Sequence, residues 1–204
     1  MARSRDISKV LSSNTTLANS YLTLASASTT YQPSATNGLT LINTTTMTAT
    51  SGSQINNIFS NTYRNYKIVV NMTTTAADSD LILRFSSNGT PNADNNSQWT
   101  YWLRNTAGSN LSFDGVNANY IFLGSMETYT NTSLTNVAFD IYNPFVATET
   151  GGNVQISTVN TSGVVTMGAG GFIKGSSTSW DGFFIGSSNS TNITGIVRIY
   201  GYKN

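Results

Sequence analysis

Apolar side chains recur at every second position in short runs along the chain from about residue 39 to its end. The clearest runs are residues 66–72, 81–85 and 137–141. In a β-strand, successive side chains point to opposite faces, so this spacing puts the apolar residues of each run on one face. The pattern therefore predicts half-buried strands. No long stretch after residue 35 shows helical periodicity, which argues against strands that alternate with helices.

The C-terminal part of the chain continues this pattern. Val154 and Ile156 alternate in one run, and "ITGIVRIYGYKN" places Val197 and Ile199 on one face. The runs are separated by dipeptides typical of turns. These dipeptides are Asn88-Gly89, Asp114-Gly115, Gly151-Gly152, Ser162-Gly163 and Asp181-Gly182. About ten strands at this spacing predict an all-β fold, an antiparallel jelly-roll-like β-sandwich over residues 38–204.

Residues 1–37 form a separate segment by pattern. In "DISKVL", Ile7, Val10 and Leu11 are spaced as on one face of a short helix, and Asp6 can cap its first turn. Residues 17–25 fit a helix or a strand, and residues 26–38 are typical of an extended linker. We therefore expect a short extended or helical segment before the sandwich.

Charge is sparse in this chain and excludes several classes of partner. Only 9% of the 204 residues are charged, and the net charge is +1. Such a chain has no field to attract a phosphate backbone, so we expect no nucleic acid partner. No apolar stretch is long enough for a membrane helix, so we expect no membrane insertion. The absence of cysteine and of a secretory signal pattern favours folding in a reducing cytoplasm.

The same scarcity of charge bears on the edges of the sheets. Monomeric sheet proteins protect their edge strands with lysine, proline or inward charges, and this chain has three prolines and few charges. Burial of the edges against identical neighbours would protect them, which favours a homo-oligomer, and we expect a homotrimer. A monomeric sandwich with ordinary Ser, Thr and Asn edges is the alternative.

The order and style of several segments resemble a family of phage proteins. The segments are "RDISKVLSSNTTLA", "TTYQPSATNGLTLINTTTMT", "FSNTYRNYKIVVNMT", "LILRFSSNGT" and "ITGIVRIYGYKN". Together they resemble short virion structural proteins of tailed bacteriophages, especially cyanophages, which form tail-fibre-like, neck or capsid-associated appendages. The resemblance implies a short tail fibre made in the host cytoplasm and carried in the virion, with host surface glycan as a further contact. A capsid decoration or head-fibre protein is the alternative within the particle.

The resemblance also implies a role for the N-terminal segment, which would dock into other proteins of the tail, neck or capsid. Arg3, Arg5, Asp6 and Lys9 would form charge-assisted hydrogen bonds to the particle. Ile7, Val10 and Leu11 would fill a groove. The alternative is a solvated chain terminus, which is common in proteins.

Catalytic chemistry has little support in the sequence. Histidine and cysteine are absent, which removes the commonest general base, the thiol nucleophile and the usual ligands of transition metals. A polysaccharide hydrolase would need two carboxylates across a cleft. The only candidate pairs are Asp78 with Asp80 and Asp140 with Asp181. We therefore expect no enzyme, no cofactor and no metal.

One loop, "NADNNS", offers oxygen ligands of the kind that Ca²⁺ prefers. Its candidate ligands are Asn92, Asp94, Asn95 and Asn96. With a single carboxylate and no EF-hand spacing, a polar loop tip is the favoured interpretation.

Aromatic residues next to this loop suggest a glycan contact. Trp99 and Tyr101 alternate onto one face of the strand that follows, and Trp102 lies on the other. Trp99 and Tyr101 could stack on sugar rings while Asp94, Asn95 and Asn96 bind hydroxyl groups. Trp180, before an Asp-Gly turn, is a second candidate of this kind. Core packing is the alternative, because the alternation does not say which face is inside.

Overall fold

The computed structural model describes residues 38–74, 79–126, 133–159 and 162–203. Every regular element in these ranges is a β-strand. The thirteen strands are β1 (Leu39–Thr50), β2 (Gly52–Ile55), β3 (Asn65–Thr74), β4 (Ser79–Ser87), β5 (Thr90–Pro91), β6 (Ser97–Asn105), β7 (Asn110–Ala118), β8 (Ile121–Met126), β9 (Ser133–Tyr142), β10 (Thr150–Val159), β11 (Val165–Lys174), β12 (Gly182–Ser187) and β13 (Ile193–Tyr202). Internal contacts divide the chain into two units, Met1–Gly38 and Leu39–Asn204.

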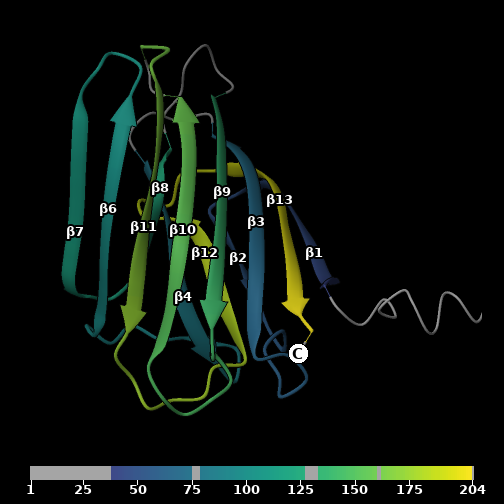
Figure 1. Ribbon diagram of the computed structural model, residues 1–204. Coiled ribbons are helices and arrows are strands. Elements are labelled where there is room, and N and C mark those ends of the chain that lie inside the picture. The colour runs from purple at the N-terminus through teal and green to yellow at the C-terminus, as the bar shows by residue number, and fades with distance from the viewer. Residues whose placement is uncertain (1–37, 75–78, 127–132, 160–161, 204) are drawn as a thin grey trace, which may run out of the picture. The chain divides into compact units, whose positions relative to one another are not determined.

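The strands form two antiparallel sheets stacked face to face (Figure 1). The larger sheet has eight strands in the order β1-β13-β3-β9-β10-β11-β6-β7. The smaller sheet has five strands, of which four are in the order β2-β12-β4-β5. The fifth strand, β8, also pairs with β4, over a different part of that strand from β5. The predicted all-β antiparallel sandwich is confirmed, with more strands than the ten expected.

The chain visits the two sheets in jelly-roll order. β1 and β3 lie in the larger sheet, β2 and β4 in the smaller one, and the last strands return so that β13 pairs with β1 and β12 with β2. This nesting of first and last strands is the double Greek key of a jelly roll. Four further strands are inserted in the sequence between jelly-roll strands and widen the larger sheet on one side: β6, β7, β10 and β11.

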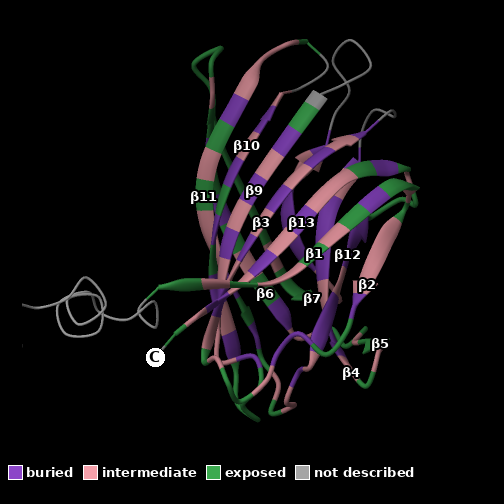
Figure 2. Ribbon diagram, turned by 90° about the vertical axis from the view of Figure 1, so that its right-hand side faces the viewer, coloured by how far each residue is buried: buried purple, intermediate pink, exposed green. Residues whose placement is uncertain are grey.

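The core lies between the two sheets because buried and more exposed residues alternate along the strands. In β3 every second residue is buried, and Figure 2 shows the same alternation along β9 and β10. Neighbouring strands are in register, so that Val70 lies between Val137 and Val197 on the inner face. Burial of these apolar side chains between the sheets supplies the main driving force for the fold.

Two glycines of β11 let the added strands pack closely. Gly168 and Gly170 face inward, where a Cβ would lie 2.2 Å from the Trp102 carbonyl oxygen and 2.3 Å from the Thr100 carbonyl oxygen. Their missing side chains leave room for Tyr101 and Leu103 of β6, which are both buried.

Two of the predicted turns are wrong. Gly115 lies in β7 and Gly152 in β10, both inside strands. In each case an aromatic ring on the neighbouring strand covers the glycine, because a Cβ would lie 2.4 Å from the Trp99 ring at Gly115 and 2.2 Å from the Phe172 ring at Gly152. These glycines make room for side chains and do not reverse the chain.

Two of the other turn signals agree with the structure. Asn88 and Gly89 have φ angles of 52° and 75° and form the turn from β4 to β5. Gly163, with a φ of 76°, lies between β10 and β11. The fifth signal, Asp181-Gly182, marks the start of β12 but forms no turn, because Gly182 is already the first residue of that strand.

Candidate functional site

β6 carries aromatic residues on both of its faces. Tyr101 is 2% exposed and Trp99 is partly buried against the core, whereas Trp102 is 63% exposed. Trp99 and Tyr101 therefore face the second sheet, and Trp102 faces outward. The prediction that Tyr101 stacks on a sugar is wrong, because its ring is enclosed in the core.

The inward aromatic residues gather around Phe122 of β8. The Phe122 ring stacks on Trp99 with a centroid distance of 5.2 Å and meets Tyr101 edge to face at 5.5 Å. The Tyr101 hydroxyl donates a hydrogen bond to the Phe122 carbonyl oxygen. Burial raises the pKa of this hydroxyl well above its ordinary value. These contacts join β6 to the smaller sheet, which is a structural role.

Trp180 is also a core residue. It is 1% exposed, its ring stacks on Phe85 with a centroid distance of 5.7 Å, and its backbone N–H donates to the Pro144 carbonyl oxygen at 2.8 Å. The prediction of a sugar contact at Trp180 is therefore wrong. The residue lies just before β12 and outside any alternating run, so no periodic pattern indicated its burial.

Polar groups of the loop before β6, residues 92–96, form hydrogen bonds within the loop and to the residue that follows β11. The Asn92 side-chain amide donates to Asp94 Oδ2 at 2.9 Å, and the Asp94 backbone N–H donates to Asn92 Oδ1 at 3.1 Å. The Asn96 amide donates to the Gly175 carbonyl oxygen at 2.7 Å. Asp94 and Asn95 are exposed, and they lie at the loop tip.

A buried lysine sits beneath this loop. Lys174 is 2% exposed, and its Nζ donates to the Asp94 carbonyl oxygen at 2.9 Å. Burial lowers the pKa of its ammonium group, and the nearby Asp94 carboxylate partly opposes that shift. Because a cation already binds the loop backbone, the loop is a poor site for Ca²⁺, and the polar loop tip is the better interpretation.

Asp140 and Asp181, one of the two candidate carboxylate pairs, have different partners in the structure. Asp140 Oδ1 lies 3.5 Å from Lys67 Nζ and accepts a hydrogen bond from the Tyr202 hydroxyl at 2.6 Å. Asp181 Oδ2 accepts from the Asn88 backbone N–H at 2.7 Å. The two carboxylates thus belong to separate sets of contacts. Asp78 lies outside the described residues, so its pairing with Asp80 is not tested.

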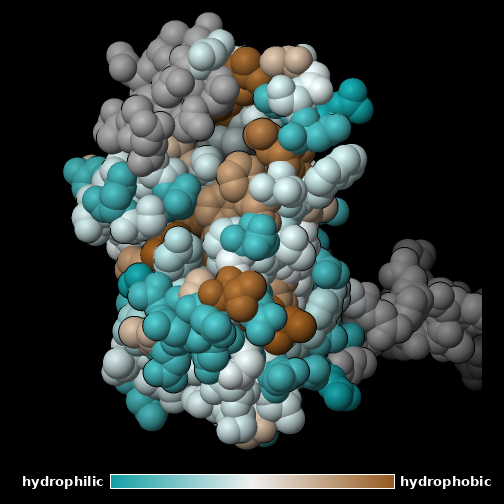
Figure 3. All heavy atoms as spheres, turned by 90° about the vertical axis from the view of Figure 1, so that its left-hand side faces the viewer, coloured by the Kyte–Doolittle hydropathy of each residue, from teal (hydrophilic) through white to brown (hydrophobic). Residues whose placement is uncertain are grey.

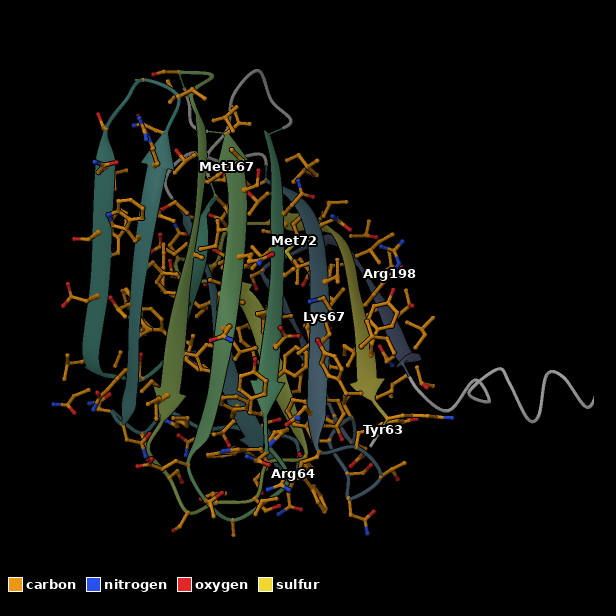
Figure 4. All side chains as sticks on the ribbon, in the orientation of Figure 1. Tyr63, Arg64, Lys67, Met72, Met167 and Arg198 are labelled. Carbon is orange, nitrogen blue, oxygen red and sulfur yellow. The ribbon has the colours of Figure 1, made fainter. Side chains whose placement is uncertain are left out.

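The outer face of the larger sheet carries polar and aromatic side chains in rows that run across the strands. One outward row crosses the whole sheet and consists of Leu41, Tyr200, Lys67, Asp140, Asn153, Gly171, Thr100 and Asp114. The next row consists of Thr44, Arg198, Val69, Ala138, Gln155, Ala169, Trp102 and Ser112. Figure 4 shows Lys67 on β3, Arg198 on β13 and Met167 on β11.

Two shallow depressions lie along this face. The first, of about 410 Å³, is lined by Gln98, Trp99, Thr100, Asp114, Gly115, Val116, Gly152, Gly171, Phe172 and Ile173. The second, of about 280 Å³, is lined by Val69, Val70, Asn71, Asn136, Val137, Ala138, Gln155, Ile156 and Ser157. Figure 3 views the molecule from the β7 side and shows hydrophobic residues interspersed with hydrophilic ones along that edge. The lining of the first depression likewise combines apolar side chains such as Val116 and Ile173 with polar ones such as Gln98 and Thr100. Such a mixed surface suits a ligand that has both apolar and hydroxyl groups.

Sequence reasoning did not select Trp102, which this face presents. A signal existed in "VTMGAGGFIK" of β11, where Gly168 and Gly170 alternate with Met167, Ala169 and Gly171. Inward glycines need bulky partners on the adjacent strand, and Tyr101 and Leu103 supply them. That pairing fixes Trp102 on the outer face.

The predicted docking residues Arg3, Arg5, Asp6, Ile7, Lys9, Val10 and Leu11 lie outside the described residues. Within the described ranges, no group of three or more His, Cys, Asp or Glu side chains is placed to hold a metal ion. The described part of the chain also contains no helix with the length and apolar character needed to cross a membrane.

No family model matches the chain, and no curated protein matches it.

Proposed function

We propose that the chain is a structural protein of a tailed-phage virion, a short tail fibre whose residues 1–37 dock into the particle. The jelly roll over residues 39–202 contacts host surface glycan. The protein is made in the host cytoplasm and carries no catalytic activity. The single observation that carries the proposal is the wide jelly-roll sheet with a polar and aromatic outer face, and the segment order that resembles phage appendages supports it.

The edges of the larger sheet support assembly as a homotrimer. β7, at one edge, exposes Leu111, Phe113 and Val116, and its only charged residue is Asp114. β1, at the other edge, exposes Leu39 and Leu41. Unpaired edges with apolar side chains favour pairing with further copies. Contact between unlike edges is heterologous, and a heterologous contact that closes on itself gives a ring such as a trimer.

A capsid decoration or head-fibre protein is the second candidate. The same jelly roll and the same edges serve that role, so the place of the chain in the particle separates the two.

Mass spectrometry of purified particles of the phage that encodes the chain tests the virion role, with sedimentation equilibrium of the isolated protein for its oligomeric state. We expect the chain in the particles in multiples of three copies and a trimer in solution. Absence of the chain from washed particles would refute the virion role, and a monomer at micromolar concentration would refute the trimer.

A further inference from the structure

We propose that the outer face of β6, β7 and β11 holds a binding site for a neutral oligosaccharide, with Trp102 as the stacking platform and Thr100, Gln98 and Asp114 as hydroxyl-binding groups. The proposal rests on the glycan contact in the proposed function and gives that contact its place and its ligand class.

The indole of Trp102 is exposed, and the residues directly opposite it on the two adjacent strands are small. Its cross-strand partners on the outer face are Ala169 of β11 and Ser112 of β7. Neither side chain reaches far enough to cover an indole, and Trp102 remains 63% exposed. An exposed tryptophan on the face of a regular sheet presents a flat, rigid surface that loses little entropy on binding.

Polar groups stand next to this platform. Thr100 lies two residues before Trp102 on the same face of β6, and Asp114 is the cross-strand partner of Thr100. Gln98 continues the row along β6. All three are exposed, and none of their side chains hydrogen-bonds another residue in the described part of the chain. Their donors and acceptors are free for a ligand, and the carboxylate can accept charge-assisted hydrogen bonds from hydroxyl groups.

The surface of β11 next to Thr100 carries no side chain, because Gly171 lies there. Gly171 pairs with Thr100, and a Cβ at Gly171 would meet only the Gly152 carbonyl oxygen at 3.3 Å and Asn153 Oδ1 at 3.9 Å. The depression of about 410 Å³ lies over this glycine. A sugar ring in the depression would have its hydroxyl groups beside Thr100, Gln98 and Asp114.

The chemistry of the site favours a neutral sugar over other ligands. The C–H groups on one face of a pyranose carry partial positive charge and contact the negative face of an aromatic ring. Asp114 is the one carboxylate and Arg104 the one cation on the outer face of β6, β7 and β11, so this face carries no net charge to attract a phosphate backbone or a uronic or sialic acid. An extended peptide would pair with a sheet edge, whereas Trp102 lies on β6 inside the sheet.

A second depression on the same face extends the site. It lies around Val69, Ala138 and Gln155, and the strand order from β6 to β3 spans four strand intervals. At about 4.8 Å per interval, the distance is roughly 19 Å. The face therefore suits an oligosaccharide of several rings, with its first ring at Trp102.

The test is a printed array of neutral oligosaccharides (glucans, mannans and galactans) and anionic ones (sialylated and uronic), probed with the full-length protein. Calorimetric titration then follows with the neutral oligosaccharide that binds best. The variants are Trp102→Ala, Trp102→Phe and Asp114→Asn. Phe145→Ala is the control, because Phe145 is an exposed aromatic residue outside the sheet. Thermal unfolding of each variant establishes that it is folded.

We expect binding to neutral oligosaccharides and a loss of affinity of about tenfold or more in Trp102→Ala, equivalent to ~1.4 kcal/mol. Trp102→Phe should keep most of the affinity because it keeps a ring, Asp114→Asn should weaken binding, and Phe145→Ala should bind as the parent does. The ligand should also blue-shift the tryptophan emission of the parent but not of Trp102→Phe.

Three results would overturn the proposal: no neutral glycan bound, a preference for anionic glycans, or Trp102→Ala binding like the parent. These results leave the virion role standing if the chain is found in the particles. Conversely, Trp102-dependent sugar binding by a chain absent from particles would refute the virion role and keep the site.

Discussion

Gly170→Ala tests the register that places Trp102 outside and Tyr101 inside. Gly170 has no positive φ, so alanine at such a position would ordinarily stabilise the protein by about 0.4–1 kcal/mol through the unfolded state. Here the new methyl group would lie 2.3 Å from the Thr100 carbonyl oxygen and 2.3 Å from Tyr101 Cδ1. The backbone oxygen cannot move away, so overpacking of about 1–3 kcal/mol should outweigh the gain.

Gly151→Ala is the matched control on the adjacent strand. A Cβ there would meet the Phe172 carbonyl oxygen at 3.4 Å and Ile173 Cγ1 at 4.0 Å, which are ordinary contacts. Alanine lowers the conformational entropy of the unfolded chain, and no steric cost opposes this effect, so Gly151→Ala should be neutral or slightly stabilising.

Thermal unfolding at one fixed protein concentration measures both variants. For a chain of this size, a change of 1 kcal/mol shifts Tm by about 2–4 °C. We therefore expect Gly170→Ala to melt below the parent and Gly151→Ala to melt at or slightly above it. Equal or higher stability of Gly170→Ala would refute the register, since it would place Gly170 on the open face.

Three further predictions follow from the core and the loop before β6. Tyr101→Phe should lower the free energy of unfolding by about 1–3 kcal/mol in urea titrations, because it removes the donor to the buried Phe122 carbonyl oxygen. Burial raises the pKa of the Tyr66 and Tyr101 hydroxyls, so as the pH rises the unfolded chain loses these protons before the folded chain does. The free energy of unfolding should therefore fall above about pH 10. Denaturant titrations at pH 8–11 should show this fall, and a smaller one in Tyr101→Phe. Ca²⁺ or EDTA should leave Tm unchanged, because the Lys174 ammonium already binds the Asp94 carbonyl oxygen; a rise of Tm with Ca²⁺ would contradict this interpretation of the loop.

The strand framework followed from local pattern. Alternating apolar residues in 66–72, 81–85 and 137–141 predicted strands, and β3, β4 and β9 contain those ranges. The pattern is informative because a half-buried strand must place one side of its pleat in the core. Gly115 and Gly152 misled the turn assignment, because their role depends on aromatic rings of neighbouring strands that a local pattern cannot show.

The faces of β6 were the main uncertainty in the candidate site. Trp99, Tyr101 and Trp102 give both faces of one strand aromatic character, so alternation alone left the direction open. The pairing with Gly168 and Gly170 of β11 decides it, and that is a contact between residues far apart in the sequence. The burial of Trp180 likewise depends on a loop folding over Phe85 and has no periodic signature.

A cryo-electron map of the intact particle tests the central claim most directly. The proposal predicts threefold groups of the jelly roll at the tail or neck, with residues 1–12 against another virion protein and the Trp102 face toward solvent. Density spread over the capsid lattice would make the chain a decoration protein and would contradict the tail-fibre role. Burial of the Trp102 face against a neighbouring virion protein would contradict its part in binding glycan.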